Sequence, residues 1–353
     1  MPLREAIARV VDGHDLSEIE MSACVEEILS GAASAALVAG LLVALRMKGE
    51  AVAELAGAAR VLRAHAVSIP DVPADAIDTC GTGGDGAGTL NVSTAAGLVA
   101  AAAGVPVAKH GNRAVSGAVG GADVLEALGV ALTLSPAALS ACLGTVGFAF
   151  LYAPALQPAL RHAAAPRREL GIRTLFNLLG PLANPARVRR QVIGVFDRRW
   201  LEPVAHVLVR LGTERAWVVH GAGGLDELSL EGESVVAEVA GGSIRLHTVT
   251  AAEAGLASAP LATLRVASVA EAAERLRAVL AGERGPGRDV VCLNAAAALV
   301  VAGRAADVRE GTALAAAAID QGRVSALLER LIAFTTRHAS GRREPGDVVV
   351  TKR

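Results

Sequence analysis

A glycine-rich loop near residue 80 has the residue types needed to hold a phosphate. It follows a short apolar segment and contains five glycines: Gly81, Gly83, Gly84, Gly86 and Gly88. Without side-chain bulk, the backbone N–H groups of such a loop can approach a phosphate closely. The order of residues therefore predicts a strand that leads into an anion-binding loop.

A helix is expected directly after this loop. Asn91, Ser93 and Thr94 are residue types that cap helix N-termini, and they precede an apolar run that ends at about Ala103. The start of a helix offers further N–H donors and a partial positive charge, both suited to an anion. This part of the sequence supports the same chemistry as the loop.

A basic cluster follows the next predicted strand, which covers Val105 to Ala108. The residues just past its end are Lys109, His110, Gly111, Asn112 and Arg113. Ligands of parallel sheets bind outside the carboxyl ends of the strands, so Lys109 is expected beside the glycine-rich loop.

The string Gly81-x-Gly83-x-x-Gly86 also matches the dinucleotide-binding fingerprint. That fingerprint requires an acidic residue at the end of the next strand, where this chain has Lys109 and His110. This argues against a nicotinamide cofactor. A plain tight turn before a capped helix explains one or two glycines, but not five of them in one loop.

Three sequence blocks together are specific enough to indicate a family. The blocks GTGGDG, NVST and KHGNR, in this order and at this spacing, resemble those of the anthranilate phosphoribosyltransferase family, and the resemblance extends over nearly the whole chain. It implies an enzyme of tryptophan biosynthesis that joins anthranilate to phosphoribosyl pyrophosphate with Mg²⁺ and releases pyrophosphate. It also implies a homodimer formed through the N-terminal domain.

The resemblance implies which residues contact each substrate. The residues that match the donor motifs are Gly81, Gly84, Asp85, Thr89, Asn91, Val92, Ser93, Thr94, Lys109, His110, Gly111, Asn112, Arg113, Ala114, Val115, Ser116, Gly117 and Gly121. Anthranilate is expected to contact Gly81, Asn112 and Arg167, whose planar guanidinium suits a carboxylate. An aromatic amine already has a free lone pair at neutral pH, so no residue is assigned as an acid or base. A packing or hydrogen-bond role is favoured for His110.

An adjacent acidic pair, Asp226 and Glu227, is the candidate metal site. Carboxylates of this kind suit Mg²⁺, which keeps several waters and bridges to substrate phosphates. On a strand the two side chains would point to opposite faces, so one shared ion requires a loop, and two separate ions or waters are the alternative. The resemblance implies that both bind metal and that Ser93 contributes from the opposite side.

A second basic block covers Arg161 to Pro185. Within it, Arg168 and Arg173 are interpreted as structural residues, and Asn177 with Gly180 and Pro181 is interpreted as a hinge between domains.

The chain also departs from the family pattern at three positions. Val119 and Gly121 stand where hydroxyl side chains are usual, and Gln157 stands where histidine is common. These departures predict weaker donor binding or a shifted aromatic acceptor.

The elements that position these residues form two predicted domains. Residues 1–71 are expected to be a small all-α domain, joined by helices from about 154–183, and residues 72–353 an α/β domain that binds phosphoribosyl pyrophosphate. A capping box at Ser17 to Glu20 begins one helix, Ser34 begins the next, and a third covers about Glu50 to His65. The fold class is therefore α/β, with a mainly parallel central sheet flanked by helices.

Composition excludes several other classes of protein. The 353 residues are 52% hydrophobic but only 2% aromatic, with a formal net charge of −1. This balance does not favour nucleic acid or an anionic membrane as a partner. The sequence shows no signal peptide and no span long enough for a bilayer. Four scattered cysteines fit reduced thiols in a cytoplasmic protein.

Three alternative functions remain open. A pyrimidine nucleoside phosphorylase shares this general architecture but would not need the acidic pair Asp226 and Glu227. A non-enzymatic relative that binds nucleic acid would require a basic groove. A paralogue that uses another aminobenzoate is compatible with the changes at Val119 and Gln157.

Overall fold

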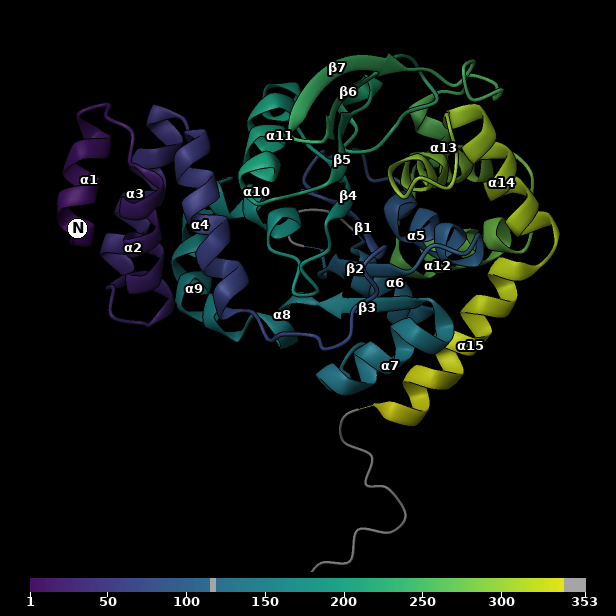
Figure 1. Ribbon diagram of the computed structural model, residues 1–353, viewed down its shortest axis with the longest axis horizontal. Helices are drawn as coiled ribbons and strands as arrows, with labels where there is room; N and C mark the ends of the chain where they lie inside the picture. Colours follow the sequence, from purple (N-terminus) through teal and green to yellow (C-terminus); the bar gives the residue numbers. More distant parts are fainter. Residues whose placement is uncertain (115–118, 340–353) are drawn as a thin grey trace, which may run out of the picture.

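Figure 1 shows a central sheet surrounded by helices, with a further group of helices at one end of the molecule. The computed structural model describes residues 1–114 and 119–339, so the predicted donor contacts Val115, Ser116 and Gly117 lie outside the described residues. Within these two ranges no helix is long and apolar enough to cross a membrane.

The sheet has seven strands in the order β3-β2-β1-β4-β5-β6-β7. They are β1 (Ile77–Gly81), β2 (Val107–Gly111), β3 (Phe148–Tyr152), β4 (Arg190–Gly194), β5 (Arg215–His220), β6 (Ser234–Ala240) and β7 (Ser243–Val249). The first five strands run parallel, and the β6–β7 hairpin continues the sheet in antiparallel pairing. The predicted mainly parallel sheet is therefore confirmed. The strand order changes direction between β1 and β4, the point at which open α/β sheets bind ligands.

Helices cover both faces of this sheet. Those around it are α5 (Val92–Ala102), α6 (Gly121–Ala127), α7 (Pro136–Val146), α11 (Leu201–Arg210), α12 (Val269–Leu280), α13 (Pro286–Val301), α14 (Val308–Asp320) and α15 (Arg323–His338). Along β4 and β5, neighbouring residues alternate between two hydrophobic cores, with Val192 and Trp217 in one and Ile193 and Val218 in the other. This alternation is the expected result of a strand buried on both sides.

The helical group begins with an element that the sequence analysis missed. Its helices are α1 (Leu3–Val11), α2 (Glu18–Leu29), α3 (Ala35–Lys48), α4 (Val52–His65), α8 (Ala153–Leu156), α9 (Arg161–Leu170) and α10 (Leu175–Leu182). The predicted capping box at Ser17 and the cap at Ser34 are both formed. In contrast, α1 follows Pro2, which makes no side-chain cap bond, so its start carries no sequence signal.

The later helices of this group pack against the earlier ones. α9 lies against α2 and α3, and α10 lies against α4. Their side chains share one hydrophobic core, to which Ala163 and Leu178 contribute beside Leu41 and Leu42 of α3. The core also includes sheet residues, so the helical group and the sheet are packed together. The domain boundary at residues 71 and 72 stays a prediction.

Two local predictions around the glycine-rich loop are wrong. Lys109 and His110 lie within β2 and not beyond it, because the parallel pairing with β3 continues to Gly111. Asn91 is the N-cap residue of α5 but makes no side-chain cap bond: its Nδ2 donates to the Val119 carbonyl at 3.2 Å, and its Oδ1 accepts no bond within the described residues. Ser93 and Thr94 lie inside the first turn of α5.

A buried carboxylate, Asp78, connects β1 to its surroundings. It accepts hydrogen bonds from the His110 backbone N–H at 3.1 Å and from Asn184 Nδ2 at 2.7 Å. Asn184 Nδ2 also donates to the Ala108 carbonyl at 2.9 Å. Burial raises the pKa of Asp78 to about 6, so these donors partly offset the cost of placing a carboxylate in the core.

Removal of the Asn184 amide should destabilise the sheet. We expect Asn184→Ala to lower the free energy of unfolding by about 2–4 kcal/mol, because Asp78 then keeps its burial but loses a donor. Urea unfolding followed by circular dichroism measures this difference. The matched control Gln321→Ala, at an exposed residue, should shift stability by less than about 0.5 kcal/mol. An unchanged urea midpoint for Asn184→Ala would contradict this view of Asp78.

Candidate active site

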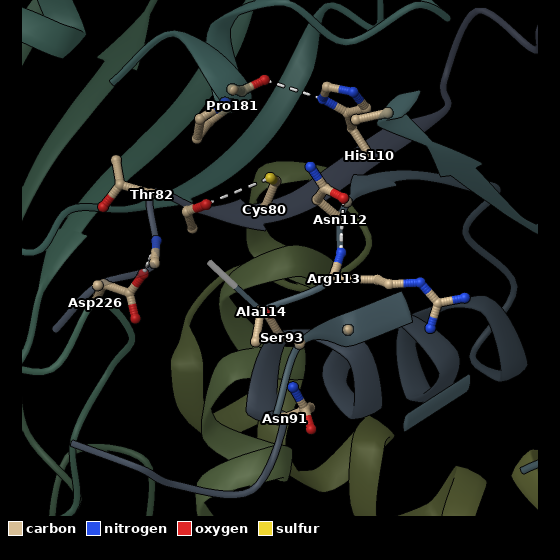
Figure 2. Close-up of a pocket in the computed structure, with 18 of the residues that line it drawn as sticks. Cys80, Thr82, Asn91, Ser93, His110, Asn112, Arg113, Ala114, Pro181 and Asp226 are labelled. Carbon is tan, nitrogen blue, oxygen red and sulfur yellow. Dashed lines mark hydrogen bonds between the residues drawn. The ribbon is translucent and has the colours of Figure 1, made fainter. Parts of the chain in front are cut away.

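A cavity of about 340 Å³ lies where the glycine-rich loop, β2 and α9–α10 meet. The predicted site residues that line it are Gly81, Gly84, Asp85, Thr89, Asn91, Ser93, Thr94, Lys109, His110, Gly111, Asn112, Arg113, Ala114, Gly121, Arg167, Asp226 and Glu227. Figure 2 shows Asp226 and His110 on opposite sides of this cavity. The fold thus brings together residues that are far apart in the chain.

Among the described residues, Val92 is the one predicted contact that does not line the cavity. Its side chain is fully buried in the hydrophobic core and does not line the cavity, because the first turn of α5 turns it away from Ser93. Conversely, the lining includes apolar residues that the sequence analysis did not select, namely Leu62, Leu160, Phe176 and Val266. In the sequence such residues are indistinguishable from ordinary core positions.

The acidic pair lies on the loop that follows β5, and the two carboxylates reach different elements. Asp226 Oδ2 accepts from the Gly83 N–H at 2.7 Å, and Glu227 Oε1 accepts from the Ser93 N–H at 2.9 Å. The loop geometry that a shared ion would require is therefore present. The pair joins the glycine-rich loop to the start of α5.

Negative charge accumulates around this pair. Burial, followed by the charge of Asp85, raises the pKa of Asp226 to about 7. Burial and the charges of Asp226 and Asp85 raise the pKa of Glu227 well above its usual value. Carboxylates crowded in this way fit a divalent cation. In residues 1–114 and 119–339 no three His, Cys, Asp or Glu side chains form a complete metal site, so substrate or water oxygens would have to complete the coordination.

Two glycines make room for Asp226. A Cβ atom on Gly81 would lie 2.4 Å from Asp226 Oδ2, and one on Gly194 would lie 1.4 Å from the Asp226 backbone oxygen. Both distances are shorter than any non-bonded contact allows. A side chain at either position would force the Asp226 loop out of the site.

Lys109 places a buried positive charge beside β1 and the start of α5. Its side chain is only 3% exposed, and Nζ donates to the Thr79 carbonyl and to Ser93 Oγ, the latter at 3.3 Å. The ammonium group therefore lies under the start of α5, beside the acidic pair. This is consistent with the expectation that Lys109 lies next to the glycine-rich loop.

His110 is fixed as a neutral hydrogen-bond acceptor. Its Nδ1 donates to the Gly180 carbonyl at 2.9 Å, which leaves Nε2 without a proton, and Nε2 has no partner within the described residues. Burial, with a smaller contribution from Lys109, lowers the pKa of His110 to about 4. The ring is thus suited to accept a hydrogen bond at neutral pH.

Arg113 points away from the middle of the cavity. Its guanidinium donates to Asp123 and Glu126 of α6, at distances of 2.8–3.0 Å. These two carboxylates hold the guanidinium at the rim, and Figure 2 shows the Arg113 side chain directed away from the middle of the cavity. A contact between Arg113 and the donor stays a prediction.

The opposite end of the cavity is formed by α9 and α10. The Arg167 guanidinium lies over the Phe176 ring, with Cζ 5.0 Å from the ring centroid, and burial lowers its pKa. Within the described ranges it has no carboxylate partner. Gln157 lines the same end, and its Nε2 donates to the Ala183 carbonyl at 2.6 Å. This end suits a planar anionic molecule.

Comparison with known proteins agrees with this geometry. The glycosyl transferase family a/b domain matches residues 73–325, and the helical bundle domain of the same family matches residues 4–66. The fold and the site thus define a glycosyl transferase of the two-domain type. Among curated relatives, the anthranilate phosphoribosyltransferase of Pelotomaculum thermopropionicum is 50% identical over 339 residues, which cover 96% of this chain and 98% of the relative.

A second relative and two solved structures give the same result. The enzyme of that name from Paramagnetospirillum magneticum is 52% identical, over 95% of this chain and 96% of its own. The Thermus thermophilus structure has a TM-score of 0.89 at 45% identity, over 94% of this chain and 99% of that one. The Saccharomyces cerevisiae enzyme, solved in complex with PRPP and Mg, has a TM-score of 0.87 at 26% identity, over 95% and 98%. This chain belongs to the anthranilate phosphoribosyltransferase family.

The neutral state of His110 can be tested directly. We expect the His110 ring to titrate near pH 4 and not near 6.5 in a histidine NMR titration. Because the folded pKa is below the unfolded pKa, this residue contributes stability that is present above pH 6.5 and is lost as the pH falls toward 4. The pH dependence of stability is compared between the wild type and His110→Gln. The contribution of Asp78, which has the opposite sign, is present in both proteins and cancels. A ring that titrates near 6.5 would contradict the conclusion that burial disfavours the charged form of His110.

Proposed function

We propose that this chain transfers the 5-phosphoribosyl group of phosphoribosyl pyrophosphate to the amine of anthranilate. The products are N-(5-phosphoribosyl)anthranilate and pyrophosphate, and the reaction belongs to tryptophan biosynthesis. The observation that carries the proposal is one cavity with two chemically distinct ends. Backbone N–H groups and the acidic pair form one end, and Arg167 forms the other.

The donor fits the end formed by the glycine-rich loop and the start of α5. Its phosphates would meet the loop N–H groups, the Ser93 hydroxyl and the positive end of the helix. Asn91 also lines this end, and its Oδ1 has no partner in the described part of the chain. A ribose hydroxyl could donate to that oxygen.

The cofactor of the proposed reaction is Mg²⁺. Asp226, Glu227 and Ser93 would hold it, because the buried acidic pair beside Asp85 concentrates negative charge that a divalent cation would neutralise. When bound, Mg²⁺ supplies charge neutralisation for the departing pyrophosphate. Lys109 supports the same end with a fixed positive charge, because its side chain is buried beside Ser93.

The acceptor fits the end formed by α9 and α10. Arg167 would bind the anthranilate carboxylate, and the two substrates would meet beside Gly81 and Asn112, which line the same cavity. The amine nitrogen then forms a bond to the anomeric carbon as the bond to pyrophosphate breaks, and the proton that the nitrogen gives up passes to water or to the released pyrophosphate. Because the amine lone pair is already free, positioning and charge stabilisation suffice, and neutral His110 can accept a hydrogen bond from the amine.

The fluorescence of anthranilate provides the test of this function. Purified protein, phosphoribosyl pyrophosphate and Mg²⁺ together should consume the signal, and omission of any one should prevent its loss. We expect Arg167→Ala to raise KM for anthranilate at least about tenfold, since a charge-assisted hydrogen-bonded pair is lost, with KM for the donor within about twofold. Arg168→Ala, an exposed neighbour on α9, is the matched control.

Other outcomes would identify the alternatives. Donor binding without consumption of anthranilate would contradict the proposed acceptor, and turnover of another aminobenzoate would then indicate a paralogue. Phosphate-dependent cleavage of thymidine would indicate a nucleoside phosphorylase. An Arg167→Ala variant with unchanged KM for anthranilate would remove Arg167 from the acceptor site.

We also propose a homodimer through the N-terminal helices. Val11, Ile19 and Met47 are large apolar side chains that are 69%, 83% and 83% exposed. They lie at one end of α1–α3, where Lys48 contacts Asp15. A second copy of this chain would remove this apolar surface from water.

We also propose a cytoplasmic location, because the four cysteines are free and buried.

The dimer can be disrupted by charge. We expect the double variant Ile19→Glu, Met47→Glu to elute as a monomer in size-exclusion chromatography with light scattering, while the wild type elutes as a dimer. Leu246→Glu, at a position 50% exposed on β7, is the control and should remain dimeric. A double variant with the mass of a dimer would show that the subunits meet elsewhere.

A further inference from the structure

Arg173 links the acceptor end of the site to the glycine-rich loop. It lies in the short connection between α9 and α10, and its Nη2 donates to the Gly84 carbonyl. Its guanidinium also lies over the Phe196 ring, with Cζ 4.4 Å from the ring centroid. Within residues 1–114 and 119–339, Arg173 forms no ion pair, so the loop carbonyl and the aromatic ring are what hold it.

The loop is also held on its other side. Thr82 N–H donates to the Gly194 carbonyl at 2.8 Å, and Thr82 Oγ1 accepts from the Phe196 N–H at 3.1 Å. Gly83 N–H donates to Asp226 at 2.7 Å. Phe196 therefore contacts both the base of the loop and the Arg173 side chain. The Arg173 bond adds a connection from the helices that carry the acceptor site.

The bond to the Gly84 carbonyl fixes the direction of the next N–H group. In a trans peptide the carbonyl and the following N–H point in opposite directions. Gly84 and Asp85 line the cavity, whereas Arg173 does not. A Gly84 carbonyl turned outward to Arg173 therefore directs the Asp85 N–H toward the cavity, where an anion would be bound.

We propose that Arg173 is a positioning residue for the donor. It holds the Gly84 carbonyl away from the cavity, so that the Asp85 N–H faces the donor phosphates. The donor assignment rests on the proposed function, while the effect on the loop does not.

Kinetics of three variants test the donor role. We expect Arg173→Met to raise KM for phosphoribosyl pyrophosphate about fivefold or more, with kcat and KM for anthranilate within about twofold, because an exposed charged hydrogen bond is modest in strength. Arg173→Lys keeps one donor and should recover most of the lost affinity. Arg168→Met is the matched control. A decrease in kcat alone, or no rescue by lysine, would overturn the proposal.

Hydrogen exchange of the free protein tests the loop itself. Backbone amides of residues 81–88 should exchange about fivefold faster in Arg173→Met, and those of β7 should not change. Unchanged exchange in the loop would overturn the proposal. If the wild type shows no transferase activity but the loop still exchanges faster in Arg173→Met, the Arg173 contact is supported and the proposed function is rejected. The failure of one proposal is therefore distinguishable from the failure of the other.

Discussion

Two side chains on one loop determine the arrangement of the whole site. Asp226 and Glu227 accept hydrogen bonds from the backbone N–H groups of Gly83, in the glycine-rich loop, and of Ser93, in the first turn of α5. These bonds join the loop after β5 to the loop after β1 and to the start of α5. β1, β4 and β5 are parallel, so their carboxyl ends lie at one edge of the sheet. The two carboxylates connect the segments that leave the sheet at that edge.

The same two bonds explain why some residues must be small. The Asp226 loop passes so close to β1 and β4 that Gly81 and Gly194 leave no space for a Cβ atom. Negative charge collects where the donor's pyrophosphate, itself an anion, is expected. A divalent cation would offset the repulsion between these carboxylates and the donor, which is the physical reason for the proposed Mg²⁺ dependence.

The sequence was sufficient to predict the elements that carry strong local signals. The glycine-rich loop, the cap at Ser34 and the mainly parallel sheet follow from residue type and spacing. Of the predicted donor contacts that the structure describes, all but Val92 line the cavity, because parallel strands bring their ends together.

Tertiary contacts determined the features that the sequence did not predict. Lys109 belongs to a strand because β3 extends the pairing, and the Arg113 side chain turns to Asp123 of α6, a partner ten positions away. Phe176 looks like any core residue until the fold places it beside Arg167. Arg173, interpreted as structural, contacts a loop 89 positions away, which no local pattern reveals.

The central claim is that the donor binds through a cation held by the acidic pair. Isothermal titration of phosphoribosyl pyrophosphate into the protein, with Mg²⁺ or with a chelator, tests it most directly. The account predicts binding with Mg²⁺, and a loss of affinity of at least about tenfold both in chelator and in Asp226→Asn, since a metal-bridged contact is removed. Equal affinity with and without Mg²⁺ in the wild type would contradict it.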